Sequence, residues 1–186
     1  MQITGPGAGG SGVQIAVIDS EGRLHTHATI VHEDKVANED GRYWSIDIPD
    51  IDPVGANDYF LYIKNTGIVD LGLTDWRLSS NAATRVDIDW VDGVPAYVGA
   101  TAVTPSSRKL GSGREPDATI NLDTDITNLT KSGRLFKIEL DTAGKMFQDT
   151  TTSNIIIPQG KAIAFKRVAV SGVIDGTISL IQYNGD

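Results

Sequence analysis

Cysteine is absent from this sequence of 186 residues. Its absence excludes a disulfide framework, a zinc–thiolate centre and a cysteine nucleophile. Apolar runs of about 20 residues, the length that a helix needs to cross a bilayer, are also missing. We therefore expect no membrane partner and no cysteine chemistry.

Positive charge is scarce, because 16 Lys and Arg residues stand against 24 Asp and Glu residues, for a formal net charge of -8. Proteins that wrap nucleic acid or lie on anionic membranes need a basic surface. We therefore expect no nucleic-acid partner. A surplus of negative charge instead suits a protein that resists nonspecific association.

Long amphipathic helical patterns are absent too, and the most strongly patterned stretch, residues 57–78, repeats every two residues. Its first half places Tyr59, Leu61 and Ile63 on one face, in the alternation typical of strands. The Asn-Thr-Gly sequence at 65–67 favours a reversal, because Asn and Gly tolerate positive φ. The stretch predicts a hairpin of two strands at the core of the fold.

Similar alternation recurs along the chain and predicts roughly nine to eleven short strands, at spacings typical of sandwiches and barrels. We predict an all-β fold, an antiparallel β-sandwich, with a single sandwich domain over residues 13–186. Residues 1–12 contain five glycines and little that packs, which predicts a flexible N-terminal arm. The arm is either a disordered tail or a segment that orders against a neighbouring subunit.

Three histidines form the only cluster whose residue types suit a metal ion. His25 and His27 share a face if their segment is a strand, and His32 follows, with Glu33 or Asp34 as a further ligand. Two histidines at this spacing on an exposed strand are usually solvated, and no supporting partner is evident. We therefore expect no bound metal and no other cofactor.

Two pairs of carboxylates are candidates for acid–base chemistry: Asp87 with Asp89, and Asp123 with Asp125. Such chemistry needs one carboxyl group in a desolvated pocket and one in a polar setting, and neither pair has neighbours that imply this. The second pair also lacks the glycine and glutamate of an EF-hand calcium loop. Nucleophile-elbow, phosphate-loop and dinucleotide motifs are absent. We therefore expect solvated strand edges, no catalytic residue and no enzyme activity.

Three tryptophans allow two kinds of role. Trp90 alternates with Val86 and Ile88 and is expected in the core. Trp44 and Trp76 fit either the core or a flat platform that binds a sugar. The second possibility would make the protein a carbohydrate-binding module.

The one basic patch lies in a long polar loop, residues 104–117. Arg108, Lys109 and Arg114 cluster there in an otherwise acidic chain. A cationic cluster on an acidic protein is a candidate surface for a partner.

Four short stretches resemble segments of β-sandwich structural proteins of tailed bacteriophages. They are Asp19–Leu24 (DSEGRL), Asp58–Leu73 (DYFLYIKNTGIVDLGL), Thr101–Gly113 (TAVTPSSRKLGSG) and Ile156–Ala164 (IIPQGKAIA). A Thr-Pro segment that leads into a Gly-Ser-Gly turn is one of the shared features. The resemblance implies a jelly-roll-like, non-enzymatic and often trimeric protein that decorates or cements the head.

On this interpretation the chain forms a homotrimer that binds the major capsid protein or another virion protein. It is assembled in the host cytoplasm and is located on the head surface of the virion. The residues expected at the partner interface are Ile3, Pro6, Arg108, Lys109 and Arg114. The alternative is a carbohydrate-binding β-sandwich module of a viral fibre or adsorption structure, and a hydrolase that uses paired carboxylates ranks third.

Overall fold

Strands make up most of the described chain, together with one α-helix of seven residues. The computed structural model describes residues 2–6, 13–18, 24–28, 33–140, 143–144, 146–149, 155–169 and 171–183. The first elements are β1 (Gln2–Pro6), β2 (Val13–Ile18), β3 (Leu24–Ala28), α1 (Glu33–Glu39), β4 (Tyr43–Ile51), β5 (Tyr59–Asn65), β6 (Leu71–Ser80) and β7 (Thr84–Tyr97). They are followed by β8 (Thr101–Ala102), β9 (Ser106–Ser107), β10 (Ala118–Leu140), β11 (Phe147–Asp149), β12 (Ile155–Ile157), β13 (Ala162–Arg167) and β14 (Ile174–Gln182).

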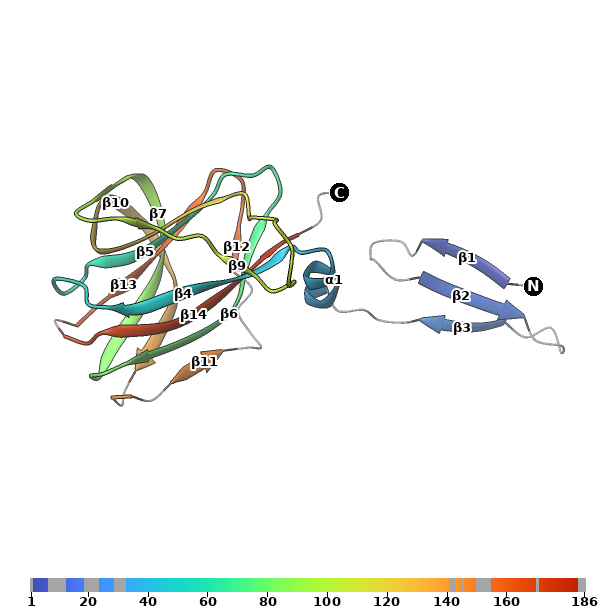
Figure 1. Ribbon diagram of the computed structural model, residues 1–186, viewed down its shortest axis with the longest axis horizontal. Coiled ribbons are helices and arrows are strands. Elements are labelled where there is room, and N and C mark those ends of the chain that lie inside the picture. Colours follow the sequence, from blue (N-terminus) through green and yellow to red (C-terminus); the bar gives the residue numbers. More distant parts are fainter. Residues whose placement is uncertain are drawn as a thin grey trace.

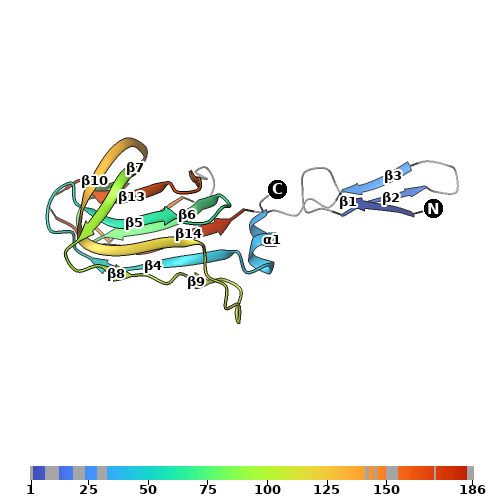
Figure 2. The same cartoon turned by 90° about the horizontal axis from the view of Figure 1, so that it is seen from above.

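Two antiparallel sheets pack face to face as a β-sandwich (Figures 1 and 2). One sheet is five-stranded, in the order β5-β13-β7-β10-β8. The other is six-stranded, with β11, β6, β14, β4 and β9 side by side and β12 paired to β6. The main hydrophobic core between them includes Trp44, Leu61, Ile88, Phe165 and Leu180. The predicted all-β antiparallel sandwich is confirmed, whereas its jelly-roll connectivity stays a prediction.

The predicted hairpin over residues 57–78 is wrong in its pairing, although both of its strands exist. β5 lies in the five-stranded sheet and β6 in the six-stranded one, so the chain crosses between sheets after Asn65. The Asn65 amide donates to the carbonyls of Val69 and Ile157, both at 2.8 Å. Its Oδ1 accepts from Gly67 N at 2.9 Å. This buried side chain satisfies backbone groups at the corner that ladder hydrogen bonds would otherwise satisfy.

β10 is 23 residues long and pairs with two strands in succession. Its first part pairs with β5, from Ala118 opposite Asn65 to Ile126 opposite Tyr59. Its second part pairs with β7, where Ile126 lies opposite Tyr97. The β7–β10 ladder therefore curls over the outer face of its sheet, and Figure 2 shows this curve. A second, smaller core there consists of Tyr62, Val91, Ile126, Ala162 and Ala164.

The first three strands form a separate antiparallel sheet in the order β1-β2-β3. Ile3 lies opposite Ala16, and Pro6 opposite Val13. β2 was expected to begin the sandwich, but among the described strands it pairs with β1 and β3, because alternation identifies a strand without identifying its sheet. The domain boundary at Val13 stays a prediction, and residues 1 and 7–12 of the expected arm lie outside the described residues.

The helix α1 packs at the end of the sandwich where β4 begins and β14 ends. Ala37 is fully buried there against Tyr43 and Ile181, which joins the helix to the six-stranded sheet. Within the described part of the chain, no helix combines the length and the apolar character that crossing a bilayer requires.

Removing residues 1–28 tests whether the sandwich is stable without its N-terminal sheet. The described sandwich strands pair with none of β1, β2 and β3. We therefore expect the melting temperature to change by less than about 2 °C, measured by differential scanning calorimetry of the full and truncated chains. A fall of more than about 5 °C would show instead that this sheet stabilises the sandwich.

Gly176 in β14 leaves no room for a side chain, because an added Cβ would lie 2.0 Å from the carbonyl oxygen of Arg77. We expect Gly176→Ala to lower the free energy of unfolding by about 2 to 4 kcal/mol in urea denaturation, since backbone of a central strand has to shift. Gly133→Ala in β10 is the matched control, because a Cβ there meets nothing within 4 Å. Equal losses for the two variants would contradict the packing described for β14.

Candidate functional site

Two carboxylates of β7 lie buried on the outer face of the five-stranded sheet. Asp87 is 2% exposed and Asp89 is fully buried. The prediction of a solvated strand edge is therefore wrong for both. β7 lies between β13 and β10, and the curled ladder covers its outer face. Alternation along one strand carries no information about a distant ladder that folds over it.

Asp89 is surrounded by donors from three strands. Lys131 Nζ of β10 lies 2.7 Å from its Oδ1, and Lys166 Nζ of β13 lies 3.1 Å from its Oδ2. The Tyr59 hydroxyl of β5 donates to Oδ2 at 3.0 Å. Burial, followed by this hydrogen bond, raises the pKa of Tyr59, so that its hydroxyl remains a donor. The buried charge thus has the partners that its desolvation requires.

Asp87 is likewise held by two cations. Arg85 Nε lies 3.0 Å from its Oδ1, and Arg134 Nη1 lies 3.2 Å from its Oδ2. Lys137 and Glu139 form a further ion pair on the same strand as Arg134. We call this surface the cationic face and define it by Arg85, Lys131, Arg134, Lys137 and Lys166. Its five cations exceed the carboxylates of Asp87, Asp89 and Glu139 by two charges.

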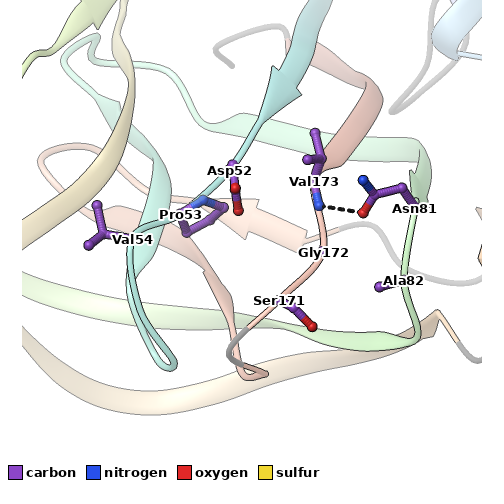
Figure 3. Close-up of a pocket in the computed structure, with 8 residues that line it drawn as sticks. All are labelled: Asp52, Pro53, Val54, Asn81, Ala82, Ser171, Gly172 and Val173. Atoms are coloured by element: carbon purple, nitrogen blue, oxygen red, sulfur yellow. Dashed lines mark hydrogen bonds between the residues drawn. The ribbon is translucent and has the colours of Figure 1, made fainter.

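Negative charge gathers at the end of the sandwich away from α1, where the β4–β5 and β13–β14 loops lie (Figure 1). Three adjoining cavities of about 600, 460 and 330 Å³ open there. Figure 3 shows the largest, in whose wall Asn81 accepts a hydrogen bond from Val173 N at 2.9 Å. We call this surface the acidic end and define it by Asp50, Asp52, Asp58, Asp123, Asp125 and Asp175.

One buried cation fixes the loops of the acidic end. The Arg167 guanidinium donates to Asp52 Oδ1 at 2.7 Å. It also donates to the carbonyls of Pro53 and, at 2.8 Å, Gly172. Arg167 therefore ties the β4–β5 loop to the β13–β14 loop. Nothing in the sequence indicates this role, because Asp52 is 115 residues away along the chain.

Asp123 lies within the acidic end and accepts hydrogen bonds from backbone N–H groups. The prediction of a solvated strand edge is therefore wrong for this residue too. Its Oδ2 accepts from Val98 N at 2.7 Å and Gly99 N at 2.9 Å, and its Oδ1 accepts from Thr124 N at 2.6 Å. Desolvation by burial raises the pKa of this carboxyl, but the backbone hydrogen bonds outweigh it and hold the pKa below its usual value.

Asp125 has the opposite electrostatic environment, although it lies two residues further along β10. Desolvation raises its pKa, and the negative charges of Asp58 and Asp123 raise it further. The side chain is only half-buried. One member of this pair therefore favours its ionised form in the folded chain, and the other disfavours it.

The two tryptophans considered for a sugar platform belong to the core. Trp44 and Trp76 are both fully buried, and Trp44 Nε1 donates to the carbonyl of Arg114 at 2.9 Å. Trp90, expected in the core, is only half-buried, and its ring centroid lies 5.8 Å from Lys161 Nζ. The carbohydrate-binding hypothesis thus loses the two tryptophans that would have formed its platform.

The predicted basic patch lies against the subunit's own surface. Arg108 Nη2 is 3.3 Å from Asp75 Oδ2, and its guanidinium stacks 4.3 Å from the ring centroid of Tyr43. Lys109 and Arg114 donate to backbone carbonyls at and just after the end of α1. All three cations therefore have partners within the chain, and their place in a partner interface stays a prediction.

The structure describes two of the three histidines that were considered as metal ligands. His25 and His27 lie in β3 opposite Val17 and Ile15, whereas His32 falls outside the described residues. Among the residues that the structure describes, no three His, Cys, Asp or Glu gather in a way that could hold a metal ion.

Comparison with protein-family models, curated proteins and solved structures finds no match to this chain. The chain offers two charged surfaces and a separate N-terminal sheet, and function is inferred from these features together with the sequence resemblance.

Substitution of Asp123 tests the pKa assignment at the acidic end. Its folded-state pKa lies below the ordinary 3.8, so its ionised form stabilises the fold above that pH, and this contribution is lost as pH falls through the folded pKa. We expect Asp123→Asn to lower the free energy of unfolding by about 1 to 3 kcal/mol at neutral pH. In urea denaturation the difference from the unsubstituted chain should shrink in acid.

Asp125→Asn is the control with the opposite sign. Its raised pKa means that the ionised carboxylate is unfavourable in the folded chain at neutral pH. Removal of its charge should therefore raise the free energy of unfolding, and the gain should disappear as pH falls and the unsubstituted carboxyl becomes protonated. A loss of stability in both variants would contradict the two environments described.

Proposed function

We propose that the protein is a non-enzymatic structural component of a virus particle, which decorates or cements the head of a tailed bacteriophage. It binds the major capsid protein or another virion protein as a homotrimer on the head surface, after assembly in the host cytoplasm. The resemblance in sequence supports this role, and a rigid β-sandwich with a separate N-terminal sheet suits it.

The observation that carries the proposal is the open edges of the N-terminal sheet. Among the described strands, β1 and β3 each pair on one side, with β2. Each therefore presents an edge whose backbone N–H and C=O groups no other described strand pairs with. Such an edge binds an added strand through main-chain hydrogen bonds. A decoration protein needs a contact of this kind, because it attaches to its neighbours through a surface outside its own core.

A sheet of this size also needs a surface to pack against. Ordering its residues costs about 1 to 2 kcal/mol each, and a small sheet alone in water is at best marginally stable. In Figures 1 and 2 the sheet lies beyond α1, apart from the sandwich. A neighbouring subunit or the capsid surface supplies the layer that completes it.

The buried carboxylate of Asp89 supports a structural role over a catalytic one. Both of its oxygens are bound, by Lys131, Lys166 and Tyr59. A carboxylate engaged in this way joins β7 to β5, β10 and β13 instead of approaching a substrate. Ion pairs between strands suit a protein that has to keep its shape within a particle.

Co-sedimentation with purified heads of the phage that encodes the chain tests the proposal. We expect the full chain to pellet with the heads, and a chain that lacks residues 1–28 to bind at least about tenfold more weakly, since it has lost the open edges. Gly133→Ala, which leaves the sheet intact, should bind like the full chain. The proposal would be overturned if the full chain failed to pellet with heads, with tails and with whole particles.

A further inference from the structure

The cationic face carries more positive charge than its own carboxylates neutralise. Asp87 and Asp89 are each shared between two cations, and Glu139 pairs with Lys137. The Arg134 and Lys137 side chains are still 44% and 47% exposed. Because strands and ion pairs hold these side chains, little freedom is lost when a partner binds them.

The acidic end combines the opposite charge with exposed apolar side chains. The buried Arg167 compensates one of its six carboxylates, that of Asp52. Val54 and Val98 are 74% and 76% exposed and border the largest and the smallest cavity. Apolar side chains in a charged surround are typical of surfaces that bind another protein.

Asp50 at this end has an uncommon backbone conformation. Its φ is 24°, and the carboxylate is exposed between two of the cavities. A residue other than glycine takes a positive φ only where the surrounding structure holds it there, and such residues cluster at functional sites.

We propose that the cationic face of one subunit binds the acidic end of a second copy of this chain. The inference names the surfaces that join the homotrimer, and for the number of subunits it rests on the proposed function. Each subunit uses its cationic face toward one neighbour and its acidic end toward the other. Such a head-to-tail contact closes into a ring when the rotation between neighbours permits, and a trimer closes with three-fold symmetry.

Charge complementarity within one sequence favours a second copy as the partner. The net charge of -8 makes two copies repel each other in most orientations. Apposing the cationic face and the acidic end brings unlike charges together, which fixes the orientation of the pair. Arg134 and Lys137 then form charge-assisted hydrogen bonds with the exposed carboxylates of Asp50 and Asp175. The same contact buries the exposed side chains of Val54 and Val98, which lie beside these carboxylates, and removes them from water.

Sedimentation velocity of four full-length proteins tests the contact. The chain itself should associate at low ionic strength and dissociate as salt is added. Arg134→Gln with Lys137→Gln, and separately Asp50→Asn with Asp175→Asn, should each raise the dissociation constant at least about tenfold. Lys35→Gln with Arg77→Gln also removes two positive charges, from α1 and from β6 of the other sheet, and should associate like the unsubstituted chain.

Mixing the two deficient variants gives a sharper test of head-to-tail geometry. The variant with an altered cationic face keeps its acidic end, and the other variant keeps its cationic face. A mixture should therefore form one-to-one heterodimers and nothing larger, although neither variant associates alone. Association of either variant at the unsubstituted level, or a mixture that stays monomeric, would overturn the proposal. A monomeric unsubstituted chain at every salt concentration would overturn it as well.

Thermal melts of the variants separate loss of contact from loss of fold. Arg85 still pairs with Asp87 after Arg134 is changed, and Asn tolerates the positive φ at position 50. If the variant with both Arg134→Gln and Lys137→Gln unfolds, the proposal is tested by Lys137→Gln alone and by the double substitution at the acidic end. Association of these variants at the unsubstituted level would refute it. Association and binding to heads are separate measurements, so a chain that associates head-to-tail but binds no head refutes the proposed function alone.

Discussion

The sandwich depends on how β10 satisfies its backbone hydrogen bonds. Its first part takes β5 as a partner and its second part takes β7, and a flat sheet does not offer both. The ladder therefore twists and curls over its own sheet. The curl buries Asp87 and Asp89, and each buried carboxylate is held by two cations. The positive surface of an acidic chain is thus a consequence of backbone pairing.

Local pattern in the sequence predicts much of the secondary structure and little of its pairing. The alternation from Tyr59 to Ile63 identified β5 because it depends on the two-residue period of a strand alone. The hairpin failed because Asn65 finds partners at Val69 and Ile157, and the second of these lies 92 residues away. The prediction that Asp89 lies at a solvated strand edge failed for the same reason, since its partners come from three other strands.

The candidate surfaces were still harder to predict, since each gathers residues from several segments. The basic loop stood out in the sequence because its cations are neighbours in the chain, yet Arg108 pairs with Asp75 and stacks on Tyr43. The cationic face draws on three strands, and the two that supply four of its five cations, β7 and β10, are not basic by themselves. The cationic face is made by tertiary pairing, so no short stretch of the sequence indicates it. The basic loop is visible in the sequence, but its cations bind partners within the subunit.

The positions of β13 and β14 bear on how the chain is made in the cell. β13 lies between β5 and β7, and β14 between β6 and β4, although both follow these strands in the sequence. During translation the five-stranded sheet is incomplete until Arg167 has left the ribosome, and the six-stranded sheet is incomplete until Gln182 has left it. The nascent chain meanwhile exposes unpaired strand edges, which are the features that lead to aggregation. The order of the strands therefore keeps these edges exposed until the last two strands of the sandwich have been made.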